Sequence, residues 1–184
     1  MRHPFVAELE NSLLLIIDIQ QAMLKVIDTW EETIRRTNQL IQAARLLGVP
    51  ILVTEHYKKG LGETVAEVTG QLKEATFYQK EYFSACLEED FIDSVRQSGR
   101  RQIVVTGMET HVCVLQTVLD LIAAGFQLHV VKNAVASRYK EDWAAAVELF
   151  RDAGAVITTA EIVIFQWICR SNTQDFRKVL PIVK

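Results

Sequence analysis

Two residues of this sequence stand where a reactive side chain would be useful. Asp18 directly follows the apolar run at residues 13–17, and Cys113 lies shortly after the apolar run at 103–106 and Gly107. A thiol near the start of a helix is expected to be more acidic, because unpaired N–H groups and the helix dipole favour the thiolate. Those N–H groups can also hold a developing oxyanion. Cys113 therefore predicts nucleophilic catalysis, with Asp18 as a candidate base.

Both residues also have an ordinary structural explanation. A free cysteine is most often a small buried hydrophobe, which is the role we expect for Cys86 and Cys169. A polar residue such as Asp18 must also end a buried strand somewhere. The position of Cys113 at an expected catalytic loop favours function over packing.

A thiol nucleophile needs a base, and the histidines offer weak candidates. His111 is two residues from Cys113, a spacing that points two helical side chains to different faces. His56 remains as the partner for a Cys/His alternative, whereas Asp18 is favoured by position. No HExxH motif is present, and Gly60 and Gly62 lack the third glycine of a dinucleotide fingerprint. The motifs therefore indicate no cofactor and no metal.

Short apolar runs alternate with helical patterns, which predicts a three-layer α/β/α sandwich around a mostly parallel, Rossmann-like sheet. We expect six strands in the order 3-2-1-4-5-6, near residues 13–17, 51–54, 77–80, 103–106, 128–131 and 156–158. Thr29-x-x-Glu32 and Thr158-x-x-Glu161 predict capping boxes at two helix starts. In such a sheet, ligands bind where the strand order reverses, between the first and fourth strands. Asp18 and Cys113 follow those two strands.

Composition limits the function further. The chain has 184 residues, 49% of them hydrophobic, which predicts a single domain over residues 1–184. A net charge of -3 gives no electrostatic reason to expect nucleic acid or an anionic membrane as a partner, so a small molecule is the expected ligand. Three widely spaced cysteines without a CxxC pair, and no apolar run long enough for a signal peptide, predict a cytoplasmic protein.

Three segments together carry a resemblance to a known family. LLLIIDIQ with Asp18 and Gln20, QKEYFSAC with Lys80, and TGMETHVCVLQTVLDL around Cys113 resemble the isochorismatase-like cysteine hydrolase superfamily from about Ser12 to the end. VTEHYKKGLGET and METHVCVLQT look most like isochorismatase-domain-containing proteins of uncharacterised substrate. The resemblance implies a catalytic triad of Asp18, Lys80 and Cys113. In it, the Lys80 ammonium would stabilise the thiolate and pair with Asp18.

The resemblance also implies further features of the site. A cis peptide is expected between Met108 and Glu109, turning the Glu109 N–H toward the oxyanion beside the N–H of Cys113. Family position makes Gln20, Tyr57 and Met108 the expected substrate-binding residues, although Gln20 is better suited to orienting loops. Relatives commonly form homo-oligomers, so a dimer or a higher assembly is expected.

Two departures from the family shape the functional hypotheses. The nicotinamidase branch holds a metal through an Asp-x-His pair, whereas this chain reads Thr54-Glu55-His56 there. True isochorismatases lack the nucleophilic cysteine that this chain has at position 113. The leading hypothesis is therefore a cofactor-independent cysteine hydrolase that cleaves a small amide or related acyl compound through a Cys113 thioester. A metal-assisted nicotinamidase-type amidase and a non-catalytic binding or scaffold protein are the alternatives.

Overall fold

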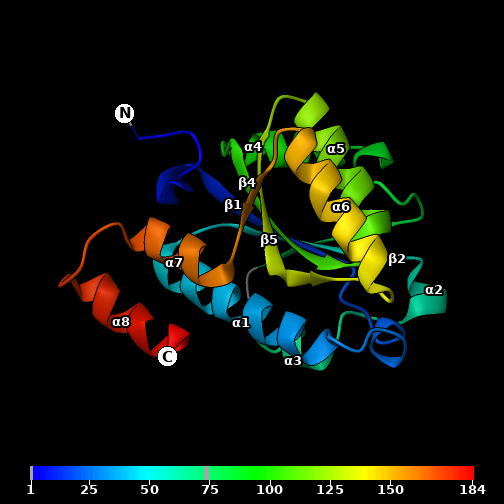
Figure 1. Cartoon of the computed structure of the whole chain (residues 1–184), viewed down its shortest axis with the longest axis horizontal. Coiled ribbons are helices and arrows are strands. Elements are labelled where there is room, and N and C mark those ends of the chain that lie inside the picture. The colour runs from blue at the N-terminus through cyan, green and yellow to red at the C-terminus, as the bar shows by residue number, and fades with distance from the viewer. Residues whose placement is uncertain (1, 73–74) are drawn as a thin grey trace.

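A six-stranded sheet forms the centre of the structure (Figure 1). The structure is a computed structural model that describes residues 2–72 and 75–184. Its strands are β1 (Ser12–Ile17), β2 (Ile51–His56), β3 (Thr76–Lys80), β4 (Gln102–Met108), β5 (Gln127–Ala136) and β6 (Val156–Thr158). The order is β3-β2-β1-β4-β5-β6, and every neighbouring pair is parallel. The predicted fold class and strand order are confirmed.

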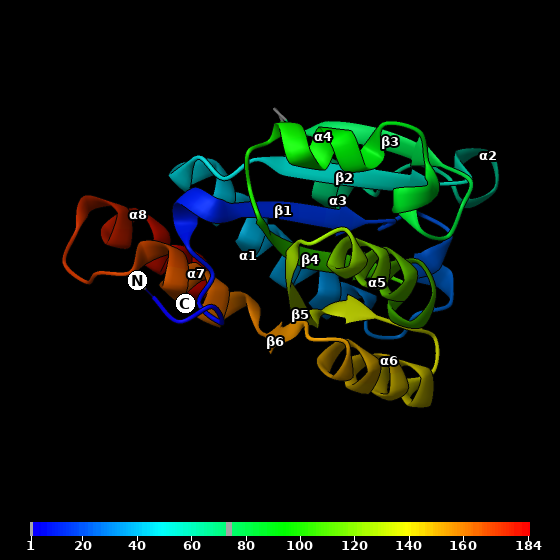
Figure 2. The same ribbon diagram turned by 90° about the horizontal axis from the view of Figure 1, so that it is seen from above.

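Helices cover both faces of the sheet (Figure 2). They are α1 (Trp30–Leu47), α2 (Lys58–Leu61), α3 (Ala66–Thr69), α4 (Phe91–Gln97), α5 (Leu115–Ala123), α6 (Lys140–Asp152), α7 (Ala160–Ile168) and α8 (Gln174–Val183). Side chains of α1, α3, α7 and α8 pack with Leu14 and Ile16, while α4, α5 and α6 pack with Leu13 and Leu15. Because successive strand residues point to opposite faces, a strand buried on both faces must be apolar throughout, as β1 nearly is.

Both predicted capping boxes are wrong in detail. Thr29 is the N-cap residue of α1, but its side chain makes no capping hydrogen bond. The Glu32 carboxylate instead accepts hydrogen bonds from the two arginines that follow it on the helix. At α7 the cap is Thr159 rather than Thr158, and its hydroxyl accepts a 3.4 Å hydrogen bond from the Ile162 N–H.

The link between β4 and α5 differs from the predicted single helix. A π-helical turn, Thr110–Val114, precedes α5 and carries Cys113. Gly107 has a φ of 140°, and a Cβ at this position would overlap the Ile17 carbonyl oxygen of β1. Glycine is therefore required where β4 comes closest to β1.

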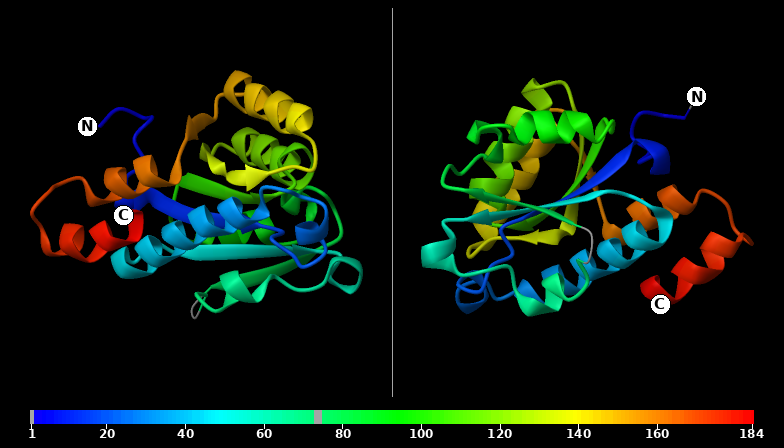
Figure 3. Two further views of the ribbon diagram at one scale, coloured as in Figure 1. Left: turned by 60° about the horizontal axis from the view of Figure 1, so that its bottom comes forward. Right: turned by 180° about the vertical axis from the view of Figure 1, so that it is seen from behind.

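Both chain termini lie near α7 and α8, at the end of the molecule away from α2 (Figure 3). Among the described residues, no helix is long and apolar enough to cross a membrane.

Candidate active site

Asp18 is fixed at the point where β1 ends. Its backbone has a φ of 52°, a left-handed conformation that aspartate tolerates better than most residues. The Asp18 N–H donates to the Thr54 carbonyl at 3.1 Å, and the Thr54 hydroxyl donates to Asp18 Oδ1 at 2.7 Å. Asp18 is only 2% exposed. Two contacts from β2 therefore hold a buried carboxylate at the switch point of the sheet.

Lys80, the last residue of β3, reaches this carboxylate across the end of β2. Its Nζ lies 2.7 Å from Asp18 Oδ2, and both side chains are almost completely buried. The ammonium also donates to the carbonyls of Tyr82 at 3.2 Å and Phe83 at 3.1 Å. A buried charge pair is tolerated when its remaining hydrogen-bonding groups are satisfied. The backbone after β3 supplies those acceptors.

Cys113 completes the cluster from the π-helical turn after β4. The charges of the Asp18 carboxylate and the Lys80 ammonium both act on its thiol. Burial, followed by the charge of Asp18, raises the pKa of Cys113 to about 12, although Lys80 lowers it. The expectation of an acidic thiol is therefore wrong, because loss of hydration and a carboxylate neighbour outweigh the ammonium. Cys113 rests as a neutral thiol beside a carboxylate that can accept its proton.

The raised pKa makes Cys113 a source of pH-dependent stability. An ordinary cysteine has a pKa of 9.0, so above that pH the unfolded chain loses a proton that the folded protein still holds. This contribution is complete below pH 9 and declines up to the folded pKa, by about 1.4 kcal/mol per pH unit. We expect the stability difference between wild type and Cys113→Ser, measured by urea unfolding, to shrink by about 1 kcal/mol from pH 8 to pH 10. A difference independent of pH would contradict the raised pKa.

The residues before Cys113 are tied to the segment between β5 and α6. The Met108–Glu109 peptide is cis, as expected. The Glu109 carbonyl accepts hydrogen bonds from the Val112 and Val114 N–H groups, both at 3.2 Å. Its carboxylate accepts a 2.7 Å hydrogen bond from the Arg138 Nε. Glu109 is thus held at both ends, by the turn itself and by Arg138.

His111 forms a second tie to the same segment. Its Nδ1 lies 2.9 Å from the Ser137 hydroxyl, and its Nε2 lies 3.7 Å from an Asp142 carboxylate oxygen. The His111 ring therefore faces this segment, in agreement with the argument against His111 as a base for Cys113.

Gln20 has both ends of its side chain bound to backbone. Its amide nitrogen donates to the carbonyls of His56 at 3.0 Å and Gly62 at 2.6 Å, and its oxygen accepts from the His56 N–H at 2.7 Å. The residue is completely buried. Gln20 thus has the geometry of a loop-orienting residue, since contact with a substrate would require these bonds to break.

Loss of this amide should weaken the loops around Asp18. In Gln20→Ala, partly buried backbone groups at His56 and Gly62 lose their partners, and we expect the free energy of unfolding to fall by about 1–3 kcal/mol. Chemical denaturation measures the change. Gln97→Ala, at an exposed position on α4, is the matched control and should change stability by less than about 0.5 kcal/mol. Equal effects of the two substitutions would contradict the orienting role.

The other two expected substrate-binding residues lie in different surroundings. Tyr57 is 53% exposed and lines a cavity of about 170 Å³ beside Lys80. Met108 is completely buried in the hydrophobic cluster on the α1 face, whereas Cys113 belongs to the cluster on the α5 face. Tyr57 is therefore placed to touch a molecule near Lys80, while Met108 packs in the core.

The residues that follow β2 offer a poor metal site. No group of three or more potential ligands forms a metal-binding cluster in the parts of the chain that the structure describes. Both Glu55 carboxylate oxygens are occupied, one by Thr64 at 2.8 and 2.9 Å and the other by Lys58 at 3.2 Å. Burial, then the charge of Lys80, lowers the pKa of His56. These residues do not fit the Asp-x-His arrangement of a metal-dependent amidase.

Sequence reasoning missed three supporting residues. Thr54 is the polar residue that follows three apolar residues in β2, directly beside Ile17 in the parallel register. That interruption was a usable signal for a partner of Asp18. Arg138 and Ser137 follow β5 and support the Cys113 turn, but an arginine or serine after a strand carries no comparable signal.

Comparisons with known proteins agree with this fold. Residues 12–162 match the family model of the isochorismatase domain. A zebrafish (Danio rerio) isochorismatase domain-containing protein 1 is 36% identical over 176 residues, which cover 95% of this chain and 61% of that protein. The structure of the MAR1 ribonuclease from Caenorhabditis elegans is 35% identical, with a TM-score of 0.90, over 96% of this chain and 91% of the other.

A more distant structure shares the fold. The Escherichia coli YcaC gene product, described as an octameric hydrolase of unknown specificity, is 22% identical with a TM-score of 0.89, over 99% of this chain and 91% of the other.

Proposed function

Because the chain belongs to the isochorismatase family, we propose that it is a cysteine hydrolase that cleaves a small amide or related acyl compound. The proposal rests chiefly on one observation. Asp18 and Lys80 form a buried ion pair at the ends of β1 and β3, and the charges of both act on the Cys113 thiol in the turn after β4. A thiol nucleophile with a carboxylate base can catalyse acyl transfer.

The first half of the reaction forms a thioester. Asp18 accepts the Cys113 proton as the sulfur attacks the carbonyl carbon of the substrate. Concerted proton removal suits a thiol that burial keeps protonated in the resting protein. The N–H groups of Glu109 and Cys113 donate to the tetrahedral oxyanion. Asp18 then returns its proton to the leaving nitrogen, and the amine departs.

The second half regenerates the thiol. Asp18 removes a proton from water as the water attacks the thioester, and the collapsing intermediate releases the carboxylic acid and the sulfur, which regains a proton. The Lys80 ammonium keeps Asp18 charged and stabilises negative charge on the sulfur. Tyr57 is the proposed contact for the body of the substrate, because it lines the cavity beside Lys80.

A panel of small primary amides, anilides and esters tests the proposal. With a reactive substrate, mass spectrometry of the quenched reaction should show the mass of an acyl group on the peptide containing Cys113. Release of acid from any substrate in the panel, without an acyl group on Cys113 under rapid quenching, would oppose the thioester mechanism. Tight ligand binding without turnover across the panel would favour the non-catalytic alternative.

The metal-assisted alternative makes a separate prediction. A nicotinamidase-type enzyme would hydrolyse nicotinamide and lose that activity on treatment with a chelator. The cysteine mechanism requires chelators to leave turnover unchanged.

A ribonuclease function is a second candidate, because the C. elegans relative is described as a ribonuclease. The buried triad and the net charge of -3 favour a small substrate for this chain over an RNA strand. An RNA-cleavage assay with wild type and Cys113→Ala distinguishes the candidates. Cleavage that is lost in the variant would favour the ribonuclease.

Arg138 is proposed as a positioning residue for the oxyanion-binding turn. Its hydrogen bond to Glu109 fixes the residue whose N–H would face the oxyanion. We expect Arg138→Ala to lower kcat about 10-fold with little change in KM, because small displacements at a catalytic group are costly. Arg138→Lys should recover part of the loss. Thermal unfolding should change little, since a partly exposed ion pair contributes about 1 kcal/mol or less.

Two further features belong to the proposal. We propose that the protein is one domain over residues 1–184, acts in the cytoplasm, and assembles as a homo-oligomer. The octameric E. coli YcaC structure supports the assembly only as a likeness of fold. Light scattering of the purified protein gives the assembly state directly.

A further inference from the structure

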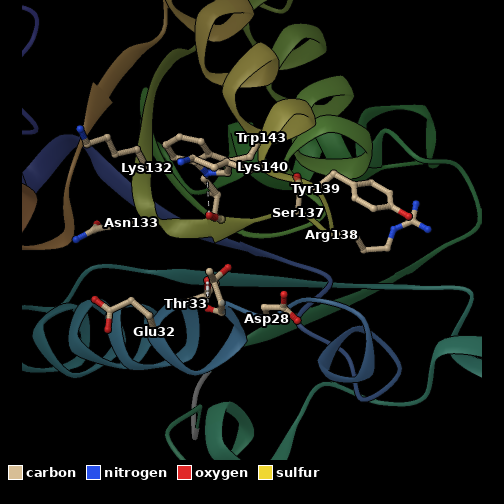
Figure 4. A pocket seen from close by; sticks show the side chains of 12 residues that line it. Asp28, Glu32, Thr33, Lys132, Asn133, Ser137, Arg138, Tyr139, Lys140 and Trp143 are labelled. Carbon is tan, nitrogen blue, oxygen red and sulfur yellow. Dashed lines mark hydrogen bonds between the residues drawn. The ribbon is translucent and has the colours of Figure 1, made fainter.

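A cavity of about 510 Å³ lies between the start of α1 and the segment that joins β5 to α6 (Figure 4). Asp18, Lys80 and Cys113 do not line it, so it is separate from the catalytic cluster. Its volume falls within the range of roughly 300–1,000 Å³ found for small-molecule sites. The cavity is thus large enough for a ligand of its own.

One part of the lining is apolar and fixed. Val135 is buried, and the Trp143 ring is anchored by a 3.1 Å hydrogen bond from its Nε1 to the Val135 carbonyl. An anchored indole beside a valine gives an apolar body a surface to pack against. Ser137 and Asn133 add neutral polar groups beside this surface.

The charged residues of the lining are divided between opposite sides, apart from Arg138, which is paired with Glu109 at 2.7 Å. Lys132 and Lys140 lie on the side formed by β5 and α6, and neither has an ion-pair partner among residues 2–72 and 75–184. Asp28 and Glu32 lie on the α1 side (Figure 4). Glu32 is neutralised by ion pairs of 2.6 Å with Arg35 and Arg36. Asp28 is then the carboxylate of the lining that has no ion pair within the described part of the chain.

We propose that this cavity binds a free amino acid with an apolar side chain. The carboxylate would face Lys132 and Lys140, the ammonium would face Asp28, and the side chain would pack against Val135 and Trp143. A simple anion would leave the Asp28 charge opposed to it, and a simple cation would leave both lysines unpaired. A zwitterion matches the two sides at once.

Titration with L-phenylalanine tests this site without any assay of turnover. We expect saturable binding by calorimetry with a Kd of roughly 0.1–1 mM, and a change in tryptophan fluorescence that Trp143→Phe removes. The analogues 3-phenylpropionate and 2-phenylethylamine, each lacking one charge, should bind about 10-fold more weakly.

Variants assign the contacts. The double variant Lys132→Ala, Lys140→Ala should bind phenylalanine and 3-phenylpropionate with about 10-fold lower affinity. Lys178→Ala, on the exposed surface of α8, should change nothing. Asp28→Asn should lower the affinity for phenylalanine to that for 3-phenylpropionate. The affinity for 3-phenylpropionate itself should not fall.

Three results would overturn the proposal. The first is no saturable binding of phenylalanine up to roughly 10 mM. The second is equal affinity for phenylalanine and 3-phenylpropionate, which indicates a plain anion site. The third is phenylalanine binding that survives the double lysine substitution. None of these depends on whether Cys113 is a nucleophile, so the cavity and the proposed hydrolase can fail separately.

Discussion

Cys113→Ala is expected to lower amide hydrolysis by roughly 10⁴-fold or more, because in the proposed mechanism the residue supplies the nucleophile rather than a contact that a neighbour can replace. Labelling by acrylamide, an electrophilic amide, should be lost at the same position. Turnover assays and intact-protein mass spectrometry measure the two effects. The fold should survive, since removal of one small buried group costs about 1–2 kcal/mol.

The other two cysteines provide matched controls. Cys86 is partly buried, and burial raises the pKa of its thiol to about 12 as well, while Cys169 is exposed. Cys86→Ala and Cys169→Ala should leave turnover unchanged. Persistent hydrolysis in Cys113→Ala, with both controls active, would show that another group performs the attack.

Lys80→Met should produce the largest loss of stability among substitutions in the cluster. It leaves the Asp18 carboxylate buried without its 2.7 Å partner, which we expect to cost about 3–5 kcal/mol in the free energy of unfolding. Activity should be lost as well, because the cation that favours negative charge on Asp18 and on the sulfur is gone. Urea unfolding monitored by circular dichroism measures the free energy of unfolding.

A double substitution shows whether the loss of stability in Lys80→Met comes from the unpaired charge or from lost packing. In Asp18→Asn combined with Lys80→Met no unpaired charge remains, so stability should return to within about 1–2 kcal/mol of wild type. Activity should not return, because the base is gone. Additive losses in the double variant would mean that Lys80 stabilises the protein mainly through packing.

The sheet and the two strand-end residues were predictable because both depend on local pattern. Residues 13–17 are apolar in succession, which favours a strand buried on both faces, and Asp18 marks its end. Cys113 follows a second such run. Strand order then brings the two ends together, since neighbouring parallel strands finish at the same edge of a sheet.

The role of Lys80 and the pKa of the Cys113 thiol depend on distant parts of the chain. A lysine at the end of a short, half-exposed strand is indistinguishable in sequence from a solvated surface lysine, and only the family resemblance selected it. The raised pKa of Cys113 follows from burial and from the charge of Asp18, partly offset by Lys80, and no local pattern encodes these two distant neighbours. The role of Arg138 likewise depends on a contact with a distant residue, Glu109.

The segment between β5 and α6 serves two neighbours at once. Ser137 and Arg138 support the turn that carries Cys113, and both also line the cavity beside α1. If an occupant of the cavity shifts either residue and so changes the affinity of the reactive turn for its own ligand, thermodynamic reciprocity requires that ligand to change the affinity of the cavity by the same factor. Binding in the cavity would then change binding at the Cys113 turn without any rearrangement of the sheet.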